Sequence, residues 1–151
     1  MESNMQHSMD HAWKYFEIHA QQRISVFNFY LATTGLVAAG IGVCLQQGGR
    51  FSLLASGLSI FLTFVSFIFW KLDQRVSLLI KRSERALAEI EKSIKNDKLN
   101  LFTEDSSDTQ LSNGVFSVWS YGRCFRISFC IIGITSFLCA LLMLTIQLTS
   151  K

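Results

Sequence analysis

The chain has no proline among its 151 residues, and charged side chains are missing from three long stretches. Without proline, no helix interior is interrupted by a residue that lacks a backbone N–H. Cysteine is sparse: Cys44, Cys124, Cys130 and Cys139 form no CxxC pair, and with three scattered histidines they show no zinc-ligand spacing. We interpret these cysteines as small apolar packing residues and predict neither a metal site nor a cofactor.

The motifs of common enzyme classes are also missing. No GxSxG, HExxH or GxxxxGK[ST] segment occurs. All three histidines precede the first arginine, which excludes the Arg-then-His spacing of one nuclease family. No run of Lys and Arg alternates with aromatic residues on a soluble face, so no direct nucleic-acid site is expected. We predict that the protein is not an enzyme and has no catalytic residues.

What the chain does have is three apolar runs without charge, at residues 24–45, 51–70 and 127–150. A bilayer core of about 30 Å needs about 20 apolar residues in a helix. A helix is required because lipid offers no partner for free backbone N–H and C=O groups. The predicted fold is therefore an all-α integral membrane protein, a single membrane domain over 1–151 with three transmembrane helices.

The connections between these runs differ in kind. Gln46-Gln47-Gly48-Gly49-Arg50 predicts a tight turn, so the first two spans should form a helical hairpin. Helical spacing continues after the second span, which predicts a long cytoplasmic helix over 71–97. Residues 98–126 are expected to form a cytoplasmic loop and an interfacial segment. Residues 1–23 are predicted to be a cytoplasmic amphipathic segment.

The distribution of Lys and Arg predicts the orientation. The segment 71–126 carries ten of them, whereas the turn between the first two spans carries one. Loops with the positive excess stay in the cytoplasm. We therefore expect the N-terminus and residues 71–126 in the cytoplasm and the C-terminus outside.

One face of the second span is lined by hydroxyl side chains at helical spacing. Its members are Ser52, Ser56, Ser59, Thr63 and Ser66. Small hydroxyl residues let helices approach closely, so the first interpretation is helix packing. The second interpretation is that this face lines a hydrated pore in an oligomer.

The first span has small residues at a spacing of four, namely Thr34, Ala38 and Gly42, which predicts a close helix contact. The first interpretation is packing of the hairpin, and the second is a contact between subunits. Asn28 is its one strongly polar side chain well inside the run, and an amide there is expected to contact another helix.

An unusual cluster precedes the first span and is predicted to act in assembly. Its members, with Asn28, are Trp13, Tyr15, Phe16, His19, Gln22 and Arg23. One interpretation is an interfacial amphipathic helix whose Arg23 extends to the headgroups. The other is a joint with the cytoplasmic helix, formed through Arg23 and Asp73.

The run Trp13-Lys14-Tyr15-Phe16-Glu17-Ile18-His19-Ala20-Gln21-Gln22-Arg23, followed by Phe27-Asn28-Phe29-Tyr30, resembles a family of small bacterial anti-phage membrane proteins. The family includes retron transmembrane effectors and accessory membrane proteins found with RNA-targeting CRISPR systems. The resemblance covers about residues 13–95, and the third span departs from two-span relatives. It implies an inner-membrane protein that assembles as a homo-oligomer and permeabilises the membrane after infection.

These observations lead to two functional hypotheses. The first is a phage-defence membrane effector that depolarises or permeabilises the bacterial inner membrane as a homo-oligomer, an abortive-infection type of defence. The alternative is a membrane scaffold without a pore that recruits a soluble defence complex through residues 71–126. The lipid bilayer is the predicted partner in both cases.

Overall fold

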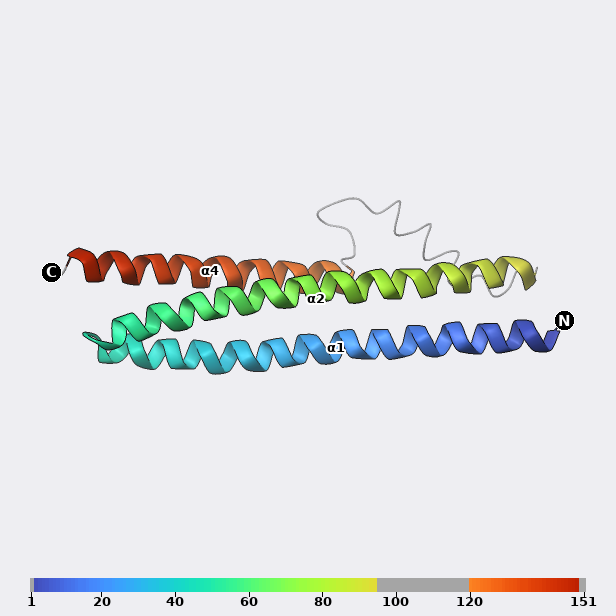
Figure 1. The fold of residues 1–151 in the computed structure, drawn as a ribbon, viewed down its shortest axis with the longest axis horizontal. Helices are drawn as coiled ribbons and strands as arrows, with labels where there is room; N and C mark the ends of the chain where they lie inside the picture. Colours follow the sequence, from blue (N-terminus) through green and yellow to red (C-terminus); the bar gives the residue numbers. More distant parts are fainter. Residues whose placement is uncertain (1, 95–119, 150–151) are drawn as a thin grey trace. The chain divides into compact units, whose positions relative to one another are not determined.

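The computed structural model describes residues 2–94 and 120–149, and this part of the chain is helical apart from its short connections. Its helices are α1 (Glu2–Gln47), α2 (Phe51–Ile94) and α4 (Tyr121–Thr149) (Figure 1). Each contains a stretch that is long and apolar enough to cross a membrane. The prediction of an all-helical chain with three such helices is confirmed for the described residues.

The helices begin and end elsewhere than the apolar runs do. Residues 1–23 and 24–45 were expected as separate segments, yet α1 is one helix of 46 residues. No proline or glycine occurs before Gly35 to interrupt it. α4 begins at Tyr121, ahead of the predicted start of the third span at Ile127. The loop expected after residue 97 lies outside the described residues up to residue 119.

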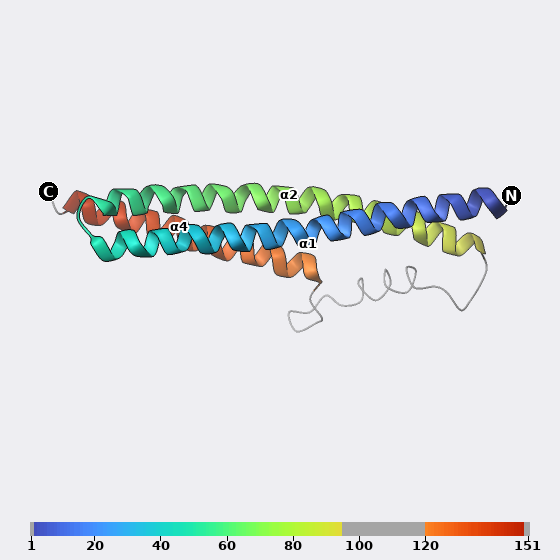
Figure 2. The same ribbon diagram turned by 90° about the horizontal axis from the view of Figure 1, so that it is seen from below.

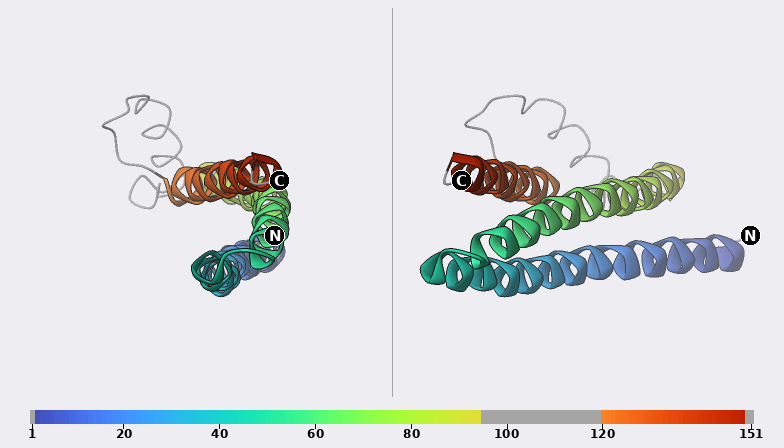
Figure 3. Two further views of the ribbon diagram at one scale, coloured as in Figure 1. Left: turned by 90° about the vertical axis from the view of Figure 1, so that its left-hand side faces the viewer. Right: turned by 60° about the vertical axis from the view of Figure 1, so that its left-hand side comes forward.

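The described residues divide into two compact units. The first, here called the three-helix unit, contains α1 from Ser25, α2 as far as Asp73, and α4. The first half of α2 lies beside both α1 and α4 in this unit, as Figures 1 and 3 show. The second, here called the two-helix unit, contains α1 up to Ile24 and α2 from Gln74. The two helix segments of that unit run side by side (Figure 2).

Aromatic side chains form the core of the three-helix unit. Tyr30, Val65, Phe125 and Phe129 are buried there, one or more from each helix. The surrounding partly buried residues are Phe27, Phe69, Trp70 and Ile132. Because large aromatic rings fill this volume from all three helices, the core fixes how the helices are rotated about their axes.

The buried face of α2 in the two-helix unit has the spacing of a helix pair. Val76, Ile80 and Leu87 are buried there, together with Ser83. Their separations of four, three and four residues are those of a coiled-coil seam. The opposite positions of the same helix are exposed and charged.

Two glycines make the turn between α1 and α2. Gly48 has φ 62° and Gly49 has φ 54°, a left-handed conformation that residues with a Cβ adopt at a cost. The Gly48 N–H donates to the Cys44 carbonyl at 3.3 Å, and the Phe51 N–H donates to the Gly48 carbonyl at 3.1 Å. These bonds end one helix and begin the next within three residues.

We expect Gly49→Ala to lower the free energy of unfolding by about 1–2 kcal/mol, because a Cβ disfavours positive φ. Gly49→Asn should lose less, since asparagine visits this conformation more readily. Thermal unfolding in detergent micelles, followed by circular dichroism, measures both. The control is Gly57→Ala in α2, where an added Cβ meets no atom within 4 Å. A loss at Gly57 equal to that at Gly49 would contradict the turn assignment.

Candidate functional site

The hydroxyl stripe predicted on α2 lies inside the three-helix unit. Ser56, Ser59 and Ser66 are 2%, 0% and 2% exposed, while Ser52 and Thr63 are half-buried. We call these five residues the hydroxyl seam. A buried hydroxyl without a hydrogen bond is costly in an apolar environment, so the partners of the seam decide what it can do.

Part of the seam bonds its own helix. Ser59 donates to the Ala55 carbonyl at 2.9 Å, Ser66 to the Leu62 carbonyl at 2.9 Å, and Thr63 to the Ser59 carbonyl at 3.0 Å. A hydroxyl that donates to the carbonyl four residues earlier has its hydrogen bond within its own helix and does not require a second helix.

The rest of the seam reaches α4. Ser56 donates to the Ala140 carbonyl at 3.4 Å, and Thr63 is 3.4 Å from the Gly133 carbonyl. Ser52 lies 3.8 Å from the sulfur of Met143. These contacts, long for hydrogen bonds, recur along both helices and keep α4 in register with α2.

A glycine of α4 makes the closest approach to the seam. A Cβ at Gly133 would lie 3.3 Å from the Ser66 Cβ, which is tighter than ordinary van der Waals contact. Small residues at such a crossing let two backbones approach each other. Ser66 of α2 and Gly133 of α4 are therefore both small enough for the two helices to lie in close contact at this point.

Tyr30 brings α1 to the same point. Its side chain is fully buried, and its hydroxyl lies 2.9 Å from Ser66 Oγ. Because the single Ser66 proton is directed at the Leu62 carbonyl, the Tyr30 hydroxyl is the donor. The Tyr30 ring packs edge-on against Phe129 of α4, with centroids 4.6 Å apart. Tyr30 was not among the predicted site residues, although its position inside an apolar run was a signal.

The seam is therefore a packed contact among three helices within one protomer. Its hydroxyls are bonded to carbonyls, to Tyr30 or to α4, and the most central ones are buried. This placement favours the packing interpretation of the stripe over the pore-lining one.

An ion pair stands at the end of the three-helix unit. Arg126 Nε of α4 donates to Asp73 Oδ2 of α2 at 3.2 Å, with the side chains 43% and 3% exposed. Asp73 and Arg23 each take part in further interactions, and the pairing of Arg23 with Asp73 stays a prediction. Arg126 lies far along the chain from Asp73, so spacing gave no signal for this pair.

Several members of the predicted assembly cluster contact one another along α1. The Tyr15 and His19 rings meet edge to face at 4.3 Å, and His19 Nδ1 is 3.2 Å from Gln22 Oε1. Trp13 and Phe16 have ring centroids 5.8 Å apart. Trp13, Tyr15 and Gln22 are exposed, whereas Phe16, His19 and Arg23 are half-buried.

The predicted helix-contact residues of α1 mostly do not face α2. Ala38 is exposed, and a Cβ added at Gly42 would meet no atom within 4 Å. Thr34 is half-buried, and its hydroxyl oxygen has no hydrogen-bond partner among the described residues. The buried face of α1 carries Tyr30, Ile41 and Cys44 instead. The exposure of Ala38 and the open surroundings of Gly42 favour the second interpretation of this spacing, a contact between subunits, over packing of the hairpin.

Asn28 is exposed, and its side chain has no hydrogen bond within residues 2–94 and 120–149. The contact with another helix that was expected for this amide is not found in the part of the chain that the structure describes. In the same described ranges, no group of three His, Cys, Asp or Glu side chains is placed to hold a metal ion.

The helices and the seam define the class: an all-helical protein with three helices long and apolar enough to span a membrane. No family model and no solved structure matches the chain. It is 55% identical over 141 residues to CD-NTase-associated protein 19 of Escherichia coli, covering 93% of each chain. The chain belongs to the family of CD-NTase-associated protein 19.

We expect Gly133→Val to lower the free energy of unfolding by about 1–3 kcal/mol, because the added side chain overpacks the contact with Ser66. Ser66→Gly in the same chain should recover part of that loss by making room. Thermal unfolding in micelles gives both values, and Gly57→Val on the exposed side of α2 is the control. Equal losses at Gly133 and Gly57, with no recovery, would show that the two helices do not meet here.

Proposed function

We propose that this chain is a membrane effector of bacterial anti-phage defence, which assembles as a homo-oligomer and depolarises or permeabilises the inner membrane. The observation that carries the proposal is the likeness to a CD-NTase-associated protein in a chain with three long apolar helices. The name of that relative supports a defence role, and the helices support a role in the membrane.

The proposed orientation keeps the N-terminus and residues 71–126 in the cytoplasm and the C-terminus outside. Ten Lys and Arg residues in 71–126 support it, against one in the turn between α1 and α2. Lys71 lies 5.0 Å from the centroid of the Trp70 ring, a pairing typical of the headgroup layer.

A water path in such an effector would lie between copies of the chain. The hydroxyl seam is packed inside the protomer, where Gly133 and Ser66 are in close contact. The outward surfaces of the spans are therefore the ones through which copies would meet.

The outward surface of α1 has two parts: Phe29, Leu36 and Val43 are 74%, 77% and 54% exposed on one side, and beside them runs a strip without large apolar side chains. At helical spacing opposite Tyr30 and Ile41, it carries only small residues and amides, here called the small-residue face of α1. This face comprises Asn28, Ala32, Gly35, Ala39, Gly42 and Gln46. All six are exposed except Gly42, which is half-buried.

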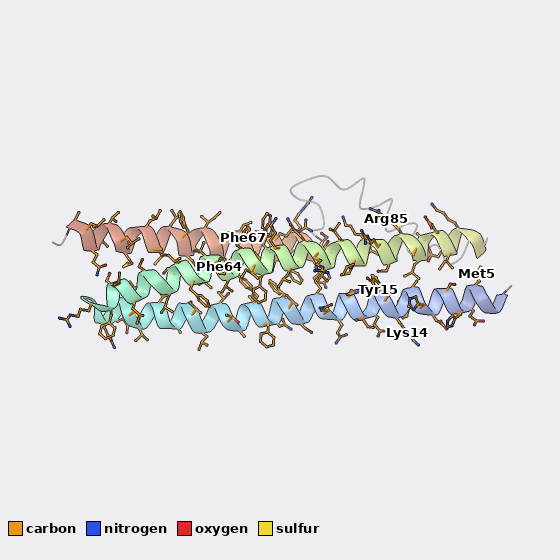
Figure 4. The ribbon with its side chains drawn as sticks, in the orientation of Figure 1. Met5, Lys14, Tyr15, Phe64, Phe67 and Arg85 are labelled. Carbon is orange, nitrogen blue, oxygen red and sulfur yellow. The ribbon has the colours of Figure 1, made fainter. Side chains whose placement is uncertain are left out.

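Large apolar side chains cover the outward surfaces of the other helices. Phe64 and Phe67 of α2 (labelled in Figure 4) are 60% and 53% exposed, and Ile134 and Phe137 of α4 are 60% and 50% exposed. Such side chains suit contact with lipid tails. The small-residue face suits close contact with another helix.

The exposed amide of Asn28 favours a second copy of the chain as the partner that binds the small-residue face of α1. An amide in an apolar layer needs a hydrogen-bond partner. Because a carboxamide both donates and accepts, the Asn28 of a second copy at the same depth supplies a matched partner.

Induction of the protein in bacteria should depolarise the inner membrane, as read with a voltage-sensitive dye beside an impermeant DNA stain. The matched control is Gly57→Ala, where an added Cβ meets no atom within 4 Å, and this variant should depolarise the membrane as the native chain does. Stable potential during phage infection, with the neighbouring defence genes present, would reject the effector proposal.

Gly35→Ile should disrupt the oligomer and abolish depolarisation, because an added Cβ meets no atom of the protomer but would separate two copies. Gly57→Ile is the matched control, since Gly57 is an exposed helical glycine with equally open surroundings. Cross-linking in native membranes measures assembly. If both variants assemble as the native chain does, copies do not meet through α1.

The alternative is a scaffold that recruits a soluble defence complex and forms no pore. One observation favours it, namely the exposed basic residues of α2 beyond the three-helix unit. A scaffold would leave the membrane potential intact while still requiring those residues for defence.

A further inference from the structure

We infer that the outward face of α2 in the two-helix unit docks an acidic segment of a soluble protein that also carries an apolar anchor. We call this surface the basic face of α2. It comprises Arg75, Leu78, Lys81, Arg82, Arg85 and Lys92, all of them exposed. The inference rests on the proposed orientation, which places this part of α2 in the cytoplasm.

The charges on α2 are segregated around the helix. The basic face lies at helical spacing opposite Val76, Ile80 and Leu87, which are buried. Glu89 is the one exposed acidic residue among the described residues of α2 from Gln74 onward. Glu84 and Glu91 are half-buried and engaged in other interactions.

The five cations have no ion-pair partner within 4 Å among the described residues, and this includes Arg85, one turn from Glu89. Like charges three and four residues apart destabilise a helix slightly. The neighbouring surface of α1 does not share this pattern, since its exposed Asp10, Lys14 and Glu17 alternate in sign. The positive charge is therefore concentrated on α2, where Glu89 is the one exposed acidic side chain beside five exposed cations (Arg85 and Lys14 are labelled in Figure 4).

The side chains on this face specify the chemistry of the partner. Three of the five cations are arginines, whose planar guanidinium groups bind carboxylates through two parallel hydrogen bonds. Leu78 is 62% exposed among them, an unusual position for a large apolar side chain on a solvated helix. A segment with carboxylates spaced around one apolar residue would satisfy both features.

Two other polyanions fit less well. α2 has no aromatic residue after Trp70, so the face offers no ring on which the bases of a single strand can stack. Arg82 stands about 18 Å, and Lys92 about 33 Å, beyond Trp70 at 1.5 Å per residue. The Debye length at physiological salt is about 8 Å, so anionic headgroups would act only on the beginning of this face.

The test uses the full chain in nanodiscs of neutral phosphatidylcholine and a fluorescent peptide of roughly 20 residues, made of Glu with Leu at every helical turn. Fluorescence anisotropy at about 0.15 M salt should show saturable binding. Removal of three charges by Arg75→Gln, Arg82→Gln and Arg85→Gln should weaken it by about tenfold. The matched control removes three exposed charges elsewhere, by Lys14→Gln, Arg50→Gln and Arg123→Gln, and should leave it unchanged.

Leu78→Ala should weaken binding of this peptide but not of a Glu–Ser peptide of the same length. Equal weakening by both triple variants, or equal affinity for the Glu–Ser peptide, would overturn the inference. Preferential binding of a single-stranded or duplex oligonucleotide would assign the face to nucleic acid instead. A response confined to vesicles containing phosphatidylglycerol would assign it to lipid. Depolarisation by the native chain is measured separately, so loss of peptide binding and loss of effector activity are read as different results.

Discussion

Ser66 is the residue at which all three helices of the three-helix unit are in contact. Its hydroxyl donates to its own helix and accepts from Tyr30 of α1, while its Cβ lies against the backbone of Gly133 in α4. An apolar environment makes each of these contacts obligatory, because an unmatched hydroxyl or a void costs free energy that no solvent restores. The aromatic core around Tyr30 is built outward from this contact.

Most of the fold could be predicted because the relevant signals are local. Three uncharged runs predicted three long apolar helices, and Gly48-Gly49 predicted the turn between the first two. The bounds of the helices were less accessible. Hydropathy marks the apolar run that begins near residue 24, whereas α1 has no residue there that ends a helix, so the apolar run and the helix begin at different places.

Such local signals could predict only part of the candidate site. Spacing placed the seam residues on one face of α2, but the partners of that face come from distant segments. Tyr30, Gly133 and Arg126 meet it only because the helices take one particular rotation and depth. The small residues of α1 left two contacts open, packing of the hairpin and a contact between subunits, for a related reason. Small residues permit close approach to any helix, and the sequence does not say which one.

Small residues occur both inside the three-helix unit and on its outward surface. Ser66 and Gly133 allow close contact within the three-helix unit, and Gly35 and Ala39 offer the same small surface outward. Lipid tails are as apolar as leucine, so close packing and hydrogen bonds, rather than the hydrophobic effect, must hold spans together. Contacts of this kind depend steeply on helix rotation. α2 runs without a break over Phe51–Ile94, so the seam and the basic face lie on one continuous helix.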